Sequence, residues 1–152
     1  MNAGSVYFFF HLLAVVFWIG GAMFNVFVMM PATAALEPAA KGALMRGVLK
    51  RFMPAAWGAI IVVVVTGFLL AGERLGSHGA LFDTENHPVL VAKVSVVTVM
   101  IIIGLIISFV LGPKAAKAGP SPEAAKIGAV IGKLAMVNVA LGVVVIGLAA
   151  SL

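Results

Sequence analysis

The chain has 152 residues, of which 63% are hydrophobic and only 10% are charged, and its mean hydropathy is +1.21. A soluble domain is about a quarter charged, so this composition excludes a water-soluble globular protein and predicts a protein integrated into a lipid bilayer. The net charge of +5 does not indicate nucleic acid as a partner, because basic residues in a membrane protein concentrate in its cytoplasmic loops.

Four charge-poor stretches predict four membrane-spanning helices, since about 20 apolar residues cross the hydrocarbon core. The first stretch has no charged residue before Glu37, and it lacks the basic start and the short apolar core of a cleaved signal peptide. The second, from Phe52 to Gly72, has no charge, and the last two contain only Lys93 and Lys133. The predicted spans are residues 5–30, 52–72, 89–112 and 127–150, which together form a single all-α domain, an up-down four-helix bundle over residues 1–152.

The distribution of basic residues predicts the orientation. The connection 31–51 has four Lys and Arg residues and the connection 113–126 has three, whereas 73–88 has only one. Because Lys and Arg accumulate in cytoplasmic loops, we expect the first and third connections to be cytoplasmic. Both termini and the middle connection then lie outside a bacterial-type inner (plasma) membrane.

Polar and small residues share one face of the first predicted helix. His11, Trp18 and Asn25 are seven residues apart, and Gly21 lies beside them. This face is expected to point into the bundle, because lipid stabilises neither polar nor small side chains. With both termini outside, His11 lies about 9 Å inside the span and Lys93 about 6 Å, so both are placed in the outer leaflet.

An ionisable residue inside a span indicates a functional site. Structural alternatives remain open for three residues: His11 lies at the membrane interface, Lys93 extends towards the headgroups, and Gly21 serves only helix packing. An inward histidine in a four-helix bundle is typical of haem ligation. In this interpretation His11 binds the iron of haem b, and Trp18, Gly21 and Phe10 line the pocket. Lys93 neutralises a propionate.

Three further predictions belong to the haem interpretation. Arg74 is a weaker candidate for a propionate partner, and His87 is a second candidate metal ligand if it reaches into the bundle. If His87 does not bind the metal, a homodimer or a redox partner subunit is expected to supply the second ligand to the iron. The expected activity is electron transfer near the outer face, and a haem-dependent membrane oxidoreductase is left open.

Two alternatives come from other functional classes. The chain has no cysteine but eight methionines, and thioether and imidazole groups select Cu(I), so His11 and methionines are candidate ligands in a copper transport or copper resistance protein. The third interpretation is a non-catalytic small subunit of a larger membrane complex. Hydrolytic chemistry is not expected, because every carboxylate lies in a predicted connection.

Three segments carry a resemblance to a known family. "HLLAVVFWIGGAMFNVFVMMPA", "RFMPAAWGAIIVVVVTGFLL" and "VLVAKVSVVTVMIIIGLIISFVLGPK" resemble the first three helices of CopD-domain proteins. The same outline is similar to HemJ-type protoporphyrinogen oxidases. That second resemblance implies b-type haem held by His11 with Lys93 nearby, whereas the CopD resemblance implies a small membrane protein that handles copper or haem.

Overall fold

The computed structural model describes residues 2–151, apart from the side chain of Arg74, and confirms an all-α fold of four long apolar helical segments. Each segment is continuously helical, because lipid offers no hydrogen-bond partners and a helix satisfies its backbone groups internally. The elements are α1 (Ala3–Phe24), η1 (Asn25–Met29), α2 (Met30–Ala32), α3 (Pro38–Leu75), η2 (His78–Leu81), α4 (Pro88–Leu105), η3 (Ile106–Leu111), α5 (Gly112–Ala118) and α6 (Pro122–Ala150).

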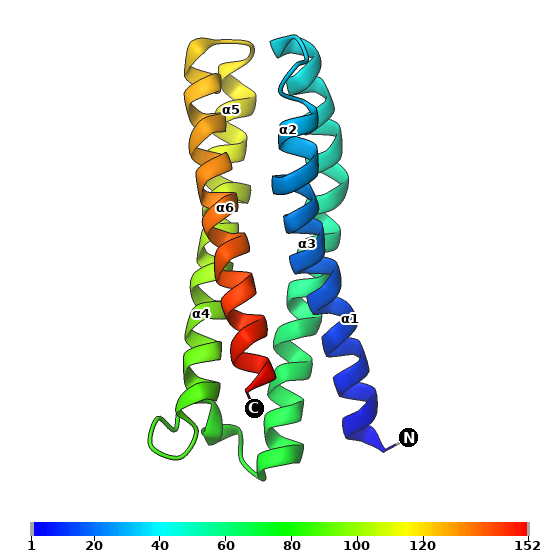
Figure 1. The fold of residues 1–152 in the computed structure, drawn as a ribbon, viewed down its shortest axis with the longest axis vertical. Coiled ribbons are helices and arrows are strands. Elements are labelled where there is room, and N and C mark those ends of the chain that lie inside the picture. Colours follow the sequence, from blue (N-terminus) through cyan, green and yellow to red (C-terminus); the bar gives the residue numbers. More distant parts are fainter. Residues whose placement is uncertain (1, 152) are drawn as a thin grey trace.

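The helical segments form two antiparallel pairs (Figure 1). Helix α1 packs along α3, and α4 packs along α6. Both chain ends and the α3–α4 connection lie at one end of the bundle, called here the terminal end. The short connections between α2 and α3 and between α5 and α6 lie at the opposite end, called here the basic end.

The helices extend beyond the predicted spans, most of all in α3. This helix begins at Pro38 and not near residue 52, so residues 38–51, for which the sequence allows a short interfacial helix, are continuous with the membrane span. The predicted span is too short because charge marks where a helix leaves lipid and not where it ends, and Ala, Leu, Met, Lys and Arg all favour helix. Helix α6 likewise begins at Pro122, where the Ser121 side chain accepts a hydrogen bond from the Ala124 backbone N–H at 3.1 Å.

Each of the two π-helical segments ends two residues before a proline, whereas α3 passes Pro54 without such a segment. Pro31 follows η1 and Pro113 follows η3, and the chain remains helical beyond both. Proline lacks an N–H, and its ring crowds the carbonyl one turn earlier. The wider π turn accommodates one extra residue, so each helix passes its proline without ending.

Side chains from all four long helices form one core. Trp18 of α1, Ile60 of α3, Met100 of α4 and Val145 of α6 belong to a single buried cluster. Large apolar side chains also cover the outside, as at Phe9 (54% exposed). Such a surface is stable only against acyl chains, so the chain is a multi-pass membrane protein surrounded by lipid.

The charges separate towards the two ends. Of the ten Lys and Arg residues in the sequence, only Arg74 and Lys93 belong to the terminal half of the bundle. The other eight belong to the basic half: Lys41, Arg46, Lys50, Arg51, Lys114, Lys117, Lys126 and Lys133. Most carboxylates lie at the terminal end, namely Glu73, Asp83 and Glu85.

Specific contacts set the register of α1 against α3. At the terminal end, the Gly4 backbone N–H donates to Glu73 Oε1 at 2.8 Å, so a carboxylate partners the first turn of α1, where the helix dipole favours negative charge. Deeper in the bundle, the Phe52 ring occupies the space that a side chain on Gly21 would fill. The Phe52 ring also stacks on Phe17, with ring centroids 6.1 Å apart.

Adjacent glycines provide a matched test of this register. We expect Gly21→Ala to destabilise the protein by about 1–3 kcal/mol, because the added methyl group overlaps the Phe52 ring. Gly20→Ala meets no atom within 4 Å and should be neutral or stabilising by up to about 1 kcal/mol through helix propensity. Thermal unfolding in detergent micelles measures both, and equal effects of the two substitutions would contradict this packing.

Candidate functional site

The half-buried imidazole of His11 faces α3 and not lipid. Its Nδ1 lies 2.9 Å from the hydroxyl Oγ1 of Thr66, a buried residue of α3. The Thr66 hydroxyl donates its hydrogen to the Val62 carbonyl one turn earlier. A hydroxyl has only one hydrogen, so with that donation Thr66 accepts from His11, and we infer that Nδ1 is the protonated nitrogen. In the neutral ring, Nε2 then carries the lone pair, which is the form that binds a metal ion.

The sequence marks Thr66 as one of several residues able to form hydrogen bonds between helices, but not as the partner of His11. The His11 ring also lies against Gly67, whose missing Cβ would be 3.4 Å from the His11 Cε1 atom. Thr66 and Gly67 therefore form one contact surface for the ring. The available signal was a Thr-Gly pair inside an otherwise apolar helix, but the sequence does not show which residue of α1 lies opposite that pair.

Trp18, Gly21 and Phe10 lie on α1, and the first two make contacts of helix packing. Trp18 is only 6% exposed and lies in the core cluster, and Phe52 fills the space beside Gly21. Phe10 is 48% exposed and makes an edge contact with Phe9, with ring centroids 5.4 Å apart. Trp18 and Gly21 therefore take part in helix packing, Phe10 lies on the exposed side of α1, and the contact of these residues with a cofactor stays a prediction.

Lys93 lies at about the same level along the bundle as His11. Ile19 of α1 and Met100 of α4 both contact the position of Gly142 on α6, which aligns those two residues along the bundle. Helices α1 and α4 run in the same direction (Figure 1). Eight residues before Ile19 is His11, and eight residues before Met100 is Ala92, the neighbour of Lys93. The two side chains belong to different helix pairs, since α1 packs on α3 and α4 packs on α6.

The other two histidines lie outside the His11 contact. His78 stacks on Phe68, with ring centroids 4.1 Å apart, and lies against Gly72. Helix geometry places those two α3 residues on the face opposite Thr66, so His78 and His11 lie on different sides of α3. His87 lies at the N-cap position of α4. Within residues 2–151, no three His, Cys, Asp or Glu side chains cluster as a metal site, and the Arg74 side chain lies outside the described residues.

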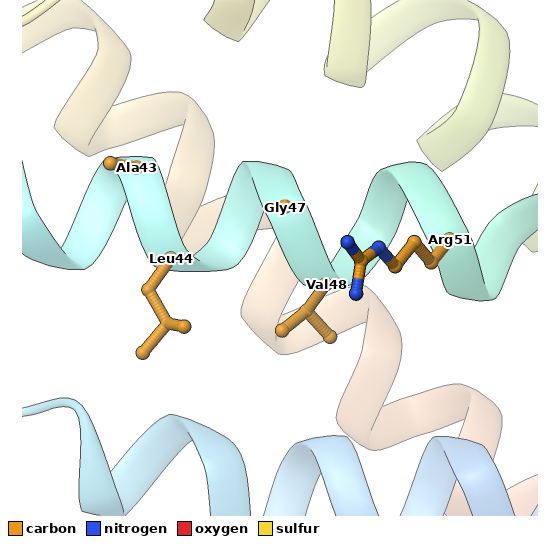
Figure 2. A pocket seen from close by; sticks show the side chains of 5 residues that line it. All are labelled: Ala43, Leu44, Gly47, Val48 and Arg51. Carbon is orange, nitrogen blue, oxygen red and sulfur yellow. The ribbon is translucent and has the colours of Figure 1, made fainter.

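Two surface hollows lie near the basic end, far from His11. One has a volume of 420 Å³ and lies along α3, where Leu44 and Val48 point to the same side and the Arg51 side chain lies beside Val48 (Figure 2). The other has a volume of 310 Å³ and includes Met53 of α3. The α3 residues that line them lie about 20–35 Å along the helix from Thr66, so neither hollow belongs to the histidine contact.

The α3–α4 connection contains a local turn built on Asp83. Its Oδ1 accepts from the backbone N–H groups of Glu85 and Asn86, at 3.1 and 3.0 Å, and its Oδ2 accepts from the Asn86 side chain at 2.8 Å. The side-chain hydrogen bond from Asn86, followed by its backbone hydrogen bond, lowers the pKa of Asp83 below the ordinary 3.8. The ionised carboxylate therefore holds the turn closed.

This arrangement predicts how the turn depends on pH. Because folding lowers the pKa of Asp83, the stabilisation is present above the ordinary pKa and is lost as the pH falls through the lowered value. We expect the Asn86 backbone amide proton to titrate in NMR spectra with a midpoint below 3.8. Asp83→Asn should abolish that titration, and a midpoint at or above the ordinary value would contradict the turn described here.

One comparison with known proteins gives a match. A family model described as CopD, copper resistance protein D, matches residues 46–152, more than two thirds of the chain. The match confirms the CopD resemblance over this range, which contains Thr66 and Lys93 but not His11. No curated protein and no solved structure matches the chain.

Proposed function

This chain belongs to the copper resistance protein D (CopD) family, and from this membership we propose that it transports copper across the membrane, with His11 Nε2 as its first ligand. The family description supports copper over haem b as the ligand. The observation that carries the assignment to His11 is its hydrogen bond to Thr66, which orients the ring and places the lone pair on the other nitrogen.

The chemistry of the side chains fits Cu(I). Thioether groups are soft ligands that Cu(I) prefers, imidazole also binds copper, and the sequence has no cysteine to compete with them. A metal-binding histidine commonly donates its other N–H to a second group, which fixes the ring and its tautomer. Thr66 supplies that acceptor from the neighbouring helix.

Methionines extend from this position towards the basic end. Met100 lies in the core, and Met23 packs against the same cluster. Met30 lies further along, against Gly132 of α6. We propose these thioethers as transient ligands for copper moving along the bundle, while His11 receives the ion at the terminal end.

Copper binding by purified variants tests the role of His11. We expect His11→Ala to abolish high-affinity Cu(I) binding, measured by competition with a chromophoric Cu(I) chelator. Thr66→Val keeps the shape of the side chain but removes the acceptor, and it should weaken binding about 10- to 100-fold. Thr66→Ser keeps the hydroxyl and should bind nearly as the wild type does.

The matched control is His78→Ala, which removes a histidine on the other side of α3 and should leave copper affinity unchanged. Equal losses in the His11 and His78 variants would show that copper binds through exposed imidazoles without the Thr66 contact. Unchanged affinity in His11→Ala would overturn the assignment of the ligand.

Haem b remains a second candidate, because Lys93 lies at the depth of His11 and its ammonium group suits a propionate. The same proteins separate the two ligands. The haem proposal requires a Soret band in the wild type that disappears in His11→Ala and weakens in Lys93→Gln. The copper proposal requires that the wild type binds stoichiometric copper without that band. It also requires that the Lys93→Gln protein retains copper.

The charge separation supports a proposed orientation. Since Lys and Arg accumulate on the cytoplasmic side, the basic end faces the cytoplasm, and both termini and the α3–α4 connection face outwards. His11 then receives copper from the outer side of the membrane.

The absence of cysteine makes this orientation directly measurable. Ser77→Cys places a single thiol in the α3–α4 connection, and Ala116→Cys places one on α5 at the basic end. In intact cells an impermeant maleimide should label the Ser77→Cys protein and not the Ala116→Cys protein, whereas lysed cells should label both. The reverse pattern would place the basic end outside.

A further inference from the structure

The 310 Å³ hollow at the basic end combines two cationic side chains with an apolar wall. Arg46 and Lys50 of α3 lie on one side, and Ile107 of η3 and Ile131 of α6 lie on the other. The hollow thus lies between the two helix pairs and is open to the surroundings of the bundle. Its composition differs from the histidine contact, and it is independent of the proposed copper function.

The two cations of the hollow are not balanced by the protein. Arg46 and Lys50 are one helical turn apart on α3, and both are exposed. Like charges at this spacing destabilise a helix. Among residues 2–151, neither forms an ion pair with a carboxylate. An anion bound between them would relieve the repulsion.

The position of the hollow indicates the kind of anion. Arg46 and Lys50 lie just before Phe52, where the charge-free part of α3 begins, so they are at the level of lipid headgroups. Leu49, Ile107 and Ile131 provide an apolar wall, as an acyl chain requires. A free phosphate would use the cations and leave this wall exposed to water, whereas a phospholipid satisfies both.

We propose that this hollow binds one anionic phospholipid, with its phosphate between Arg46 and Lys50 and an acyl chain along Ile107 and Ile131. Basic pockets between transmembrane helices are suited to such headgroups. The lipid would bridge α3 to η3 and α6 at the basic end, where the two helix pairs meet.

Native mass spectrometry of the full chain, released from nanodiscs that contain phosphatidylglycerol and phosphatidylcholine, tests this proposal. The wild type should retain one phosphatidylglycerol in preference to phosphatidylcholine. The double variant Arg46→Gln and Lys50→Gln should lose that preference by about tenfold or more, because it removes both cations that hold the phosphate. Ile131→Trp keeps both cations but fills the hollow, and it should also lose the bound lipid.

The matched control is the double variant Lys114→Gln and Lys117→Gln, which removes two positive charges of α5 at the same end without changing the lining of the hollow. It should retain the wild-type preference. Equal losses in the two double variants would overturn the proposal in favour of non-specific attraction. It would also be overturned if inorganic phosphate displaced the lipid, or if the hollow variants changed only the proportion of dimer.

Discussion

The antiparallel contact between α1 and α3 determines where the polar groups of the terminal half lie. Within this contact, Glu73 accepts from the first turn of α1, Thr66 accepts from His11, and Phe52 lies against Gly21. A slip of one helical turn, about 5.4 Å, would break all of these contacts together. The register therefore holds an ionisable imidazole in an apolar bundle at a defined place and in a defined tautomer.

Much of the fold follows from the sequence for simple physical reasons. Charge-free stretches such as Phe52–Gly72 must be helical in lipid, and the uneven distribution of Lys and Arg indicates which connections share a side. The seven-residue spacing of His11 and Trp18 predicts an inward face, and the structure confirms it, since His11 faces α3 and Trp18 is buried. The helix ends were less predictable, because residues 38–51 have both the charge of a connection and the propensity of a helix.

The candidate site was only half predictable. His11 stands out because it is ionisable within an apolar segment, whereas Thr66 resembles any hydroxyl residue of a membrane helix until α3 is placed against α1. The same holds for Gly21, since the sequence cannot show that the space beside it is filled by Phe52 and not by a ligand. Pairings between helices depend on register, and register results from the packing of the whole bundle.

The two ends of the bundle have different chemistry. The terminal end has the three histidines and most of the carboxylates, and the basic end has eight cations with an apolar hollow between the helix pairs. A cation approaching from solution is repelled less at the terminal end, and an anionic headgroup is attracted to the basic end. Metal ligation and lipid binding are therefore proposed at separate places, and each can be removed without changing the residues of the other.

The tautomer of His11 is the most direct test of the central claim. Nitrogen-15 NMR of protein labelled at histidine, with the three rings assigned by substitution, distinguishes a protonated nitrogen from one with a lone pair. The His11–Thr66 contact predicts a protonated Nδ1 and an unprotonated Nε2 whose resonance moves when Cu(I) is added. A protonated Nε2 in the neutral ring, or an Nε2 resonance unaffected by Cu(I), would contradict the assignment of this nitrogen as the copper ligand.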